Sequence, residues 1–249
     1  MEVLDIYLKL KGDSMLSIII PVLNQIEFTD NCLKSLRENI IQPPEIIVID
    51  NGSTDPYRDL MEKYRDLNIM YIKNETNIGV NASWNHGIFK TRRPYVLFLN
   101  NDTYCNKYFI KKILKTMEDE KIGVCIPVRE VTIIRTETEN NDNDPILENS
   151  KYVEGWAFTI RREMYNKIGP IPDLFKTYMG DTYYFECAEC LGYKIVQMIN
   201  NTVWHYGSLT IKEYTQNQME MRRIHKEENN AWRKIREGLL EEVKQKNLI

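Results

Sequence analysis

Long hydrophobic runs are missing from this sequence. The longest apolar stretch, Met15–Leu23, covers nine residues and includes Ser17, whereas a membrane-spanning helix needs about 20. The stretch therefore predicts a buried strand and not a membrane span. The first 14 residues also lack the basic segment followed by an apolar segment that marks a secretory signal. We expect a cytosolic protein.

An excess of positive charge is missing as well. The 249 residues include 33 lysines and arginines against 36 aspartates and glutamates, a net charge of −3 at pH 7. Broad electrostatic binding to nucleic acid needs a basic face, so nucleic acid is not an expected partner, although a local basic patch is compatible with these numbers. The hydrophobic share of 43% and the charged share of 28% are typical of a globular domain with a substantial core.

Cysteines are few and odd in number. Five of them at wide spacings argue against a disulfide framework. Cys187 and Cys190 form a C-x-x-C pair, yet a structural zinc site needs four ligands and the sequence has no second such pair. In a helix the two thiols lie on one face. We interpret them as packing residues, with metal or redox chemistry as the alternative.

Short β-branched runs alternate with helical patterns through the first 127 residues. The runs predict strands at Ser17–Pro21, Glu45–Asp50, Ile69–Lys73, Tyr95–Leu99 and Ile122–Pro127. The helical patterns lie at Thr29–Asn39, after an Asp55 N-cap, at Asn81–Lys90, and from an Asn106 cap to Asp119. This order predicts an α/β fold with a doubly wound, mostly parallel sheet and flanking helices.

The pattern weakens after Pro127. It predicts an exposed loop, a strand, a helix and a further strand, at Glu137–Asn149, Gly155–Ile160, Asp181–Gly192 and Lys194–Met198. The tail from Ile211 to Ile249 reads as a charged helical extension with a thin apolar stripe, formed by Trp232, Ile235, Leu239 and Leu240. We expect this extension to pack on the domain. A homodimer through the C-terminal helices and docking on a membrane surface are the alternatives.

Polar side chains follow the predicted strands, at the sheet edge where doubly wound folds bind ligands. They are Asn24-Gln25, Asp50-Asn51-Gly52-Ser53 and Asn100-Asn101-Asp102. The Asp50 carboxylate suits hydrogen bonds from a base or a ribose hydroxyl, and an ordinary strand-to-helix turn explains it equally well. Asp102 suits Mg²⁺ or Mn²⁺, which often take only one or two protein oxygens, whereas an Asn-rich turn is the alternative.

Two further candidates lie in the second half of the chain. Asp181 can act as the N-cap of the helix that it begins, or as a base that takes a proton from an attacking hydroxyl. His205 follows Trp204 near the end of the last predicted strand. A lone histidine is more often structural than a ligand, but neutral imidazole also binds Mn²⁺ or Mg²⁺ beside a carboxylate.

The order and spacing of these segments resemble the inverting glycosyltransferase family 2, whose members have the GT-A fold. In the first half the resemblance is carried by Ser17–Asn24, Ile47–Asp55, Asn74–Gly79, Ala82–Gly87 and by Phe98–Asp102 at the family's D-x-D motif. The second half resembles the rhamnosyltransferase-like branch, in Gly155–Arg162, Ile168-Gly169, Asp173–Phe175, Asp181 with Tyr193 twelve residues later, and His205–Ser208.

The resemblance implies a nucleoside-diphosphate sugar as donor and Mg²⁺ or Mn²⁺ as cofactor. The residues implied to bind the donor are Pro21, Val22, Leu23, Asn24, Asp50, Asn77, Asn100 and Asn101. By the same resemblance Asp102 and His205 hold the metal, which neutralises charge on the departing diphosphate. Asp181 deprotonates the acceptor hydroxyl. Trp156 stacks on a sugar ring of the acceptor or belongs to the core.

Two positions depart from the family pattern. Asn100 stands where the D-x-D motif begins, which leaves Asp102 as the only motif carboxylate for the metal. Gly180 stands where a glutamate usually precedes the base. A nucleotide-sugar-binding protein without catalysis and a transferase acting on protein or modified DNA are therefore kept as alternatives. A nucleotidyltransferase is a further one, although Pro21–Asn24 is neither glycine-rich nor basic.

The resemblance also divides the chain. We expect an N-terminal extension at 1–14, a nucleotide-sugar-binding α/β half at 15–127, an acceptor-binding and catalytic half at 128–210, and a helical tail at 211–249. The expected donor is a UDP-, dTDP- or GDP-sugar, and the expected acceptor is a glycan or a lipid-linked molecule. Family relatives often act at the cytoplasmic membrane face, so a cytoplasmic protein at the membrane periphery is compatible with the family.

Overall fold

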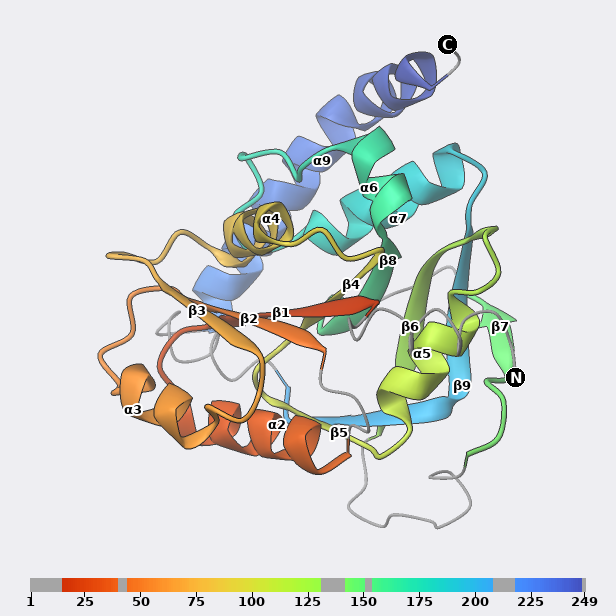
Figure 1. Ribbon diagram of the computed structural model, residues 1–249. Helices are drawn as coiled ribbons and strands as arrows, with labels where there is room; N and C mark the ends of the chain where they lie inside the picture. Colours follow the sequence, from red (N-terminus) through yellow and green to blue (C-terminus); the bar gives the residue numbers. More distant parts are fainter. Residues whose placement is uncertain (1–14, 40–43, 131–141, 151–153, 208–217, 248–249) are drawn as a thin grey trace.

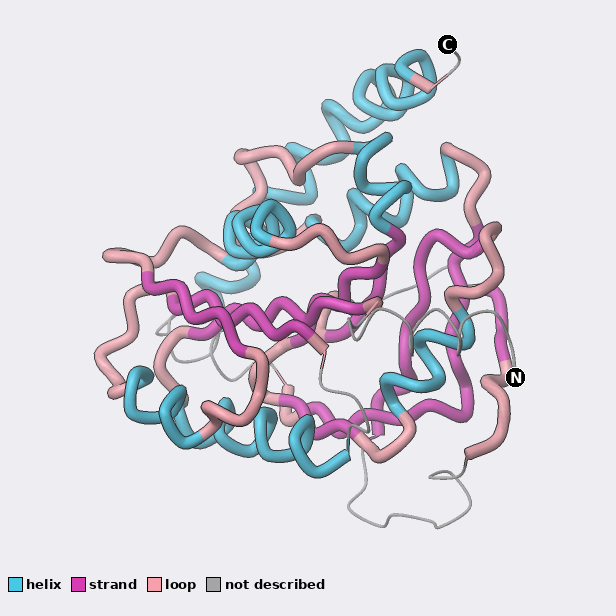
Figure 2. The backbone as a smooth tube through the Cα atoms, viewed as in Figure 1, coloured by secondary structure: helices cyan, strands magenta, loops and turns pink. Residues whose placement is uncertain are grey.

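The computed structural model describes residues 15–39, 44–130, 142–150, 154–207 and 218–247. The expected N-terminal extension at 1–14 lies outside the described residues, as do the first part of the Glu137–Asn149 loop and the beginning of the tail. Figure 1 shows the described residues as a central sheet with helices on both sides. In Figure 2 the strands, in magenta, run between two groups of cyan helices.

Among the described residues, nine strands form one sheet in the order β3-β2-β1-β4-β8-β6-β9-β5, with β7 paired to β9. They are β1 (Leu16–Val22), β2 (Glu45–Asp50), β3 (Ile69–Lys73), β4 (Tyr95–Leu99), β5 (Thr103–Cys105), β6 (Ile122–Glu130), β7 (Leu147–Asn149), β8 (Ala157–Arg161) and β9 (Lys194–His205). β1 to β4 pair in parallel, and β9 is parallel to β6. β8 runs antiparallel to both β4 and β6, and β5 and β7 run antiparallel to β9.

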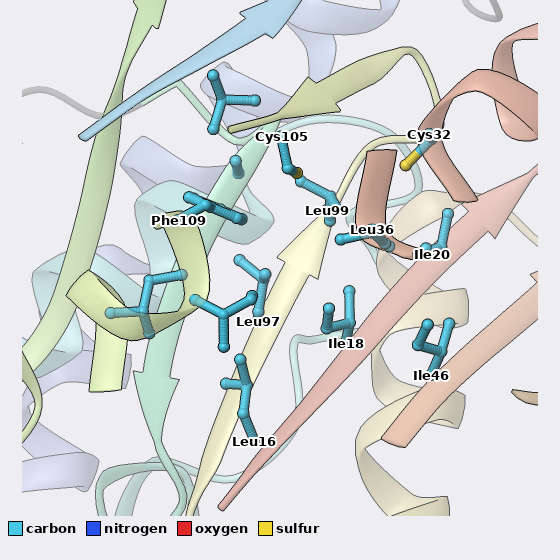
Figure 3. Close-up of a cluster of buried hydrophobic side chains, with 14 of the residues drawn as sticks. Leu16, Ile18, Ile20, Cys32, Leu36, Ile46, Leu97, Leu99, Cys105 and Phe109 are labelled. Atoms are coloured by element: carbon cyan, nitrogen blue, oxygen red, sulfur yellow. The ribbon is translucent and has the colours of Figure 1, made fainter. Parts of the chain in front are cut away.

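Helices cover both faces of the sheet because its central strands are apolar on both sides. Along β1, Ile18 and Ile20 belong to one core and Ile19 to the other. The first core, shown in part in Figure 3, is covered by α2 (Ile26–Asn39), α3 (Tyr57–Lys63) and α5 (Phe109–Thr116). The second is covered by α4 (Val80–Lys90), α6 (Arg162–Ile168), α7 (Gly180–Cys190) and α9 (Gln218–Lys246).

The predicted α/β fold with a doubly wound sheet and flanking helices is confirmed. β2, β3 and β4 have the predicted bounds. β6 continues beyond the predicted Pro127 to Glu130, across the boundary expected between residues 127 and 128. The structure adds β5, β7 and α6, which the sequence did not predict. β7 lies in the expected loop and is exposed, so its side chains give no alternating apolar signal.

The predicted N-cap role of Asp55 is wrong. α3 begins after Pro56 without a side-chain cap, and Asp55 Oδ2 accepts a hydrogen bond from the backbone N–H of Ile26 at 3.1 Å. Ile26 begins α2, three residues before the predicted Thr29, and its N–H has no partner within its own helix. The turns after β1 and β2 lie together, so Asp55 caps the earlier helix and not its own.

The helix predicted after Asn106 and the strand predicted from Lys194 also end at other residues than expected. Asn106 Oδ1 accepts the Tyr108 N–H at 3.0 Å, but α5 begins at Phe109 and ends at Thr116, short of the predicted Asp119. β9 extends from the predicted Met198 to His205. Asn200 and Asn201 sit inside it, and these polar residues made the strand seem to end early. The extension brings His205 into the sheet.

The C-terminal tail forms α9, and its predicted apolar stripe packs on the domain. Trp232 is 3% exposed. Its ring meets those of Phe175 and Tyr183 at centroid distances of 5.9 and 6.2 Å, and its Nε1 donates to Glu186 Oε1 at 3.3 Å. The stripe that suggested a homodimer is thus used within the chain. None of the described helices combines the length and the apolarity that crossing a bilayer requires.

The docking of α9 can be tested at Trp232. Trp232→Ala removes a buried indole from the contact with Phe175 and Tyr183, and we expect it to lower the free energy of unfolding by about 3–5 kcal/mol. Arg233→Ala, at an exposed neighbouring position of the same helix, is the control and should change it by less than about 0.5 kcal/mol. Urea unfolding measures both. Equal effects would contradict the docking of α9 on the second core.

Candidate functional site

A cleft with a volume of about 1010 Å³ lies where the parallel strands end. Its walls include the residues that follow β1, β2 and β4 and the ends of β6 and β9. Of the predicted site residues it is lined by Pro21, Val22, Leu23, Asn77, Asn100, Asn101, Asp102, Trp156, Asp181 and His205. Asn24 and Asp50 are the two that do not line it. The carboxyl edge of the sheet therefore gathers most of the predicted site into one cavity.

Asp102 and His205 are brought together by strand pairing. β5 begins at Thr103 and pairs antiparallel with the end of β9, so that Thr103 faces His205, and the Tyr206 N–H donates to the Asp102 carbonyl oxygen at 3.0 Å. His205 Nε2 lies 3.2 Å from Asp102 Oδ1. Both side chains line the cleft although Asp102 is only 3% exposed and His205 only 6%.

The surroundings of His205 leave its ring nitrogens available. Trp156 stacks on the imidazole with a centroid distance of 5.0 Å and an angle of 16° between the planes. Within the described residues neither Nδ1 nor Nε2 makes a hydrogen bond, although Asp102 Oδ1 lies 3.2 Å from Nε2, and a buried nitrogen without a hydrogen bond is costly. A cation bound between imidazole and carboxylate would satisfy one nitrogen. Trp156, for which stacking on a sugar ring and a place in the core were both open, packs on the histidine and also lines the cleft.

This donor set suits a divalent cation completed by a substrate. In the part of the chain that the structure describes, no group of three or more His, Cys, Asp or Glu side chains is able to hold a metal. Mg²⁺ and Mn²⁺ sites often use one or two protein ligands and take the remainder from phosphates and water. Asp102 with His205 fits that case. Neighbouring Asn100 donates its N–H to the Trp156 carbonyl oxygen at 2.8 Å, which ties the motif to β8.

Asp181 lies on another wall of the cleft, in the first turn of α7. Its Oδ1 accepts the Thr182 N–H at 2.7 Å. Burial raises the pKa of the Asp181 carboxyl, and hydrogen bonds from backbone N–H groups, that of Gly155 among them, act in the opposite direction. A Cβ atom on Gly155 would come within 2.7 Å of Asp181 Oδ2. The glycine therefore makes room for the carboxylate.

The departure at Gly180 has a steric explanation. A Cβ atom there would lie 2.1 Å from Asn81 Oδ1, so the space that a side chain would need is filled by Asn81 from α4. The preceding residue, Met179, has a left-handed backbone with φ of 64°. A residue larger than glycine at position 180 would require Asn81 to move.

Asp50 is fully buried behind the cleft wall and does not line it. Its Oδ1 accepts the Ser53 N–H at 2.8 Å, and its Oδ2 accepts the Tyr71 hydroxyl at 2.6 Å. Lys73 Nζ lies 3.8 Å from the same Oδ2. In this structure Asp50 holds the turn after β2, and Asn51 is the residue of that turn that reaches the cleft.

Three predicted donor-binding asparagines also have structural partners. Asn24, with φ of 51°, accepts the Thr54 N–H on its Oδ1 at 2.9 Å and so ties the turn after β1 to the turn after β2. Asn77 Oδ1 accepts the Gly79 N–H at 2.8 Å. Asn101 Nδ2 donates to Thr29 Oγ1 at 2.9 Å. These bonds fix the rim of the cleft, and Asn77 and Asn101 line it as well.

Sequence reasoning missed a charged pair beside His205. Arg129 lies near the end of β6 and lines the cleft, and its guanidinium donates to the His205 carbonyl oxygen at 3.4 Å. Its second terminal nitrogen lies 3.7 Å from Glu154, whose Oε2 also accepts from Trp156 Nε1 at 2.9 Å. Extending the predicted strand by two residues would have placed Arg129 at the same edge. For Glu154 the sequence offers no local signal.

Known proteins with similar sequences include glycosyltransferases. The profile of Glycosyl transferase family 2 matches residues 17–181. The poly(ribitol-phosphate) β-N-acetylglucosaminyltransferase TarS of Staphylococcus aureus is 32% identical over 114 residues, which are 44% of this chain and 20% of that protein. Glycosyltransferase GlyA of Streptococcus pneumoniae is 25% identical over 116 residues, 46% of this chain and 16% of that protein. The chain thus spans well under two thirds of these relatives.

Solved structures share the fold. TarS residues 1–349 in complex with UDP superpose with a TM-score of 0.61 at 20% identity, over 76% of this chain and 59% of that one. The mannosyltransferase PcManGT from Pyrobaculum calidifontis, in complex with GDP-Man and Mn²⁺, gives a TM-score of 0.62 at 17% identity, over 78% and 57%. At such identities the likeness concerns the fold, which is that of GT-A glycosyltransferases.

The family profile begins with β1 and ends at Asp181. It takes in the turns after β1, β2 and β4 and covers well over half of the 249 residues. The chain therefore belongs to glycosyl transferase family 2.

Proposed function

We propose that this protein transfers a sugar from a nucleoside-diphosphate sugar to a hydroxyl of a glycan-type acceptor, with inversion at the anomeric carbon. One observation carries the proposal: a single cleft brings the buried Asp102–His205 pair and the carboxylate of Asp181 together on its walls. The Asp102–His205 pair suits a cation that binds a diphosphate, and the Asp181 carboxylate can accept a proton.

The donor end of the cleft is formed by Pro21 to Leu23, Asn51, Asn77 and the turn Asn100 to Asp102. We place the nucleoside and the diphosphate there. Support comes from solved structures of the same fold: one TarS structure contains UDP, another contains UDP-GlcNAc, and PcManGT contains GDP-Man with Mn²⁺. Asp50 and Asn24 do not line the cleft and instead hold the two turns that carry the contacting residues.

Asp102 and His205 are the residues proposed to hold Mg²⁺ or Mn²⁺. When bound, such an ion neutralises the charge that develops on the departing diphosphate. The chain itself supplies the orientation: the β5–β9 pairing fixes His205 beside Asp102, and the Trp156 ring packs against the imidazole face. Because both side chains are buried, electrostatic interactions are stronger at this point of the cleft than in open solvent.

Asp181 is the proposed base. The acceptor oxygen attacks the anomeric carbon as its proton passes to an Asp181 carboxylate oxygen, and the bond to the diphosphate breaks with its electrons remaining on the phosphate oxygen. One displacement of this kind inverts the anomeric configuration. A carboxyl whose pKa is raised by burial is the stronger base. No carboxylic acid is needed to protonate the leaving group, in contrast to a glycosidase.

The acceptor is proposed from the relatives' chemistry. TarS is named for poly(ribitol phosphate), and another relative from Staphylococcus epidermidis is a teichoic acid poly(glycerol phosphate) polymerase. By analogy with these relatives, we propose a polymer of this kind or its lipid-linked precursor as the acceptor, and the cytoplasmic membrane face as the place of the reaction.

Within the chain, we assign donor binding mainly to residues 15–127 and the base to residues 128–210.

The metal assignment predicts a ranking of two variants. Asp102→Ala removes the only motif carboxylate, and we expect kcat/KM to fall by about 100-fold or more. Asn100→Ala removes one neutral amide, and we expect a loss of about tenfold or less. Steady-state rates with UDP-, dTDP- and GDP-sugars at saturating Mn²⁺ provide the comparison. The opposite ranking would rule out Asp102 as the main ligand.

The base assignment predicts the effect of Asp181→Asn, which keeps the shape and removes the proton acceptor. We expect transfer to fall by about 100-fold or more, while Mn²⁺-dependent nucleotide binding, measured by calorimetry, stays close to that of the parent. A parent-like transfer rate would remove Asp181 as the base. Intact binding with no transfer by the unaltered protein would favour a non-catalytic binding protein.

The same variant tests the raised pKa through stability. The pKa of Asp181 is higher in the folded than in the unfolded chain. Ionisation of this carboxyl therefore lowers the free energy of unfolding of the parent, and the loss begins as pH rises above the usual carboxyl pKa of 3.8. Relative to the parent, Asp181→Asn should therefore gain stability between about pH 3.5 and about pH 7. Urea unfolding at both pH values measures it. A relative loss over that interval would contradict a raised pKa.

A further inference from the structure

We infer that Glu228, on the C-terminal helix α9, is a positioning residue for the proposed base Asp181. The inference rests on the proposed function, because it assigns a task to α9 in the same reaction. α9 begins at Gln218, beyond the residues 17–181 that match the family profile. The helix nevertheless forms part of the cleft wall, through Glu220, Arg223, Ile224, Glu227, Glu228 and Ala231.

Glu228 binds the backbone of the segment Lys176–Tyr178, which leads to the proposed base. Its Oε1 accepts the N–H groups of Lys176 and Thr177, both at 3.1 Å, and its Oε2 accepts the N–H of Tyr178 at 2.7 Å. The side chain is buried, with 7% of the residue exposed. A buried carboxylate needs such partners, and three consecutive N–H groups oriented toward one carboxylate fix the path of the chain just before Asp181.

A second side chain holds the same segment by donating to its carbonyl oxygens, whereas Glu228 accepts from its N–H groups. Asn81, on α4, donates from Nδ2 to the carbonyl oxygens of Phe175 and Tyr178 at 3.1 and 2.8 Å. Its own N–H donates to the Lys176 carbonyl oxygen at 3.3 Å. The N–H groups of Lys176, Thr177 and Tyr178 are thus bound by α9, whereas the carbonyl oxygens of Phe175, Lys176 and Tyr178 are bound by α4. Neither contact is made by a residue adjacent in sequence.

The packing of Trp232 positions Glu228 along α9 opposite this segment. The two residues are one helical turn apart and lie on the same face of α9. The Trp232 ring packs on Phe175, which precedes the segment, and on Tyr183, which follows Asp181 in α7. α9 therefore touches the chain before, within and after the segment. A displacement of this segment would move the carboxylate that must meet the acceptor proton, and misplacements near 1 Å can cost about 100-fold in rate.

The test compares Glu228→Ala and Glu228→Gln with Glu237→Gln, a matched change at an exposed position of α9 that does not line the cleft. The first readout is amide hydrogen exchange at Lys176, Thr177 and Tyr178 without ligand. The second is kcat and donor KM with Mn²⁺ and the UDP-, dTDP- or GDP-sugar that the parent turns over. All are measured well below each variant's midpoint of thermal unfolding.

We expect faster exchange at the three amides and a fall in kcat of about 10- to 100-fold in Glu228→Ala, with donor KM changed less than about twofold. Glu228→Gln should lie between, because its amide group can accept on one side only. Glu237→Gln should match the parent. An unchanged kcat in Glu228→Ala, or kcat and donor KM shifting together in proportion to lost stability, would overturn the positioning role. A parent that binds and transfers none of these sugars would instead remove the proposed function.

Discussion

The candidate site depends on the antiparallel pairing of β5 with the end of β9. Three residue pairs, from Thr103–His205 to Cys105–Val203, join segments about 100 positions apart in the chain. This pairing adds β5 as the last strand of the sheet and places the His205 imidazole beside the turn that carries Asp102. Without it, Asp102 is an acidic residue in an Asn-rich turn, and His205 is an isolated histidine at a strand end. With it, the two form a buried pair of donors suited to a divalent cation.

The rest of the cleft follows a division between residues that contact the cavity and residues that hold them. Asp50, Asn24 and Asp55 do not line the cavity. Asp50 holds the turn after β2, and Asn24 and Asp55 connect the turns after β1 and β2 by accepting hydrogen bonds from backbone N–H groups. On the other side, Asn81 and Glu228 hold the segment that leads to Asp181. Polar residues at a sheet edge therefore serve two purposes, and only the structure separates those that face the cavity from those that support it.

The sequence was informative wherever the signal was local. Consecutive β-branched residues bounded by polar turns gave β2, β3 and β4 their correct ends. β5, β7 and the end of β9 were missed because short, polar or Asn-containing strands depend on their partners, not on their own composition. Asp55 was misassigned because its competing partner, the Ile26 N–H, comes from a different turn. Glu228 could not be found, since nothing in a charged helix marks the one carboxylate that binds a backbone 50 residues away. The rhamnosyltransferase-like branch stays a prediction from resemblance.

The proposed function requires the cleft to bind a nucleoside diphosphate together with a divalent cation. The most direct measurement is the thermal unfolding midpoint of the unaltered protein with UDP, dTDP and GDP, each with Mn²⁺ and with a chelator. A ligand that binds the folded state raises the midpoint as its concentration exceeds its dissociation constant. We expect at least one of these nucleotides to raise the midpoint with Mn²⁺ and to lose that effect with the chelator. No shift with any of them, or the same shift with and without the cation, would contradict the proposed function.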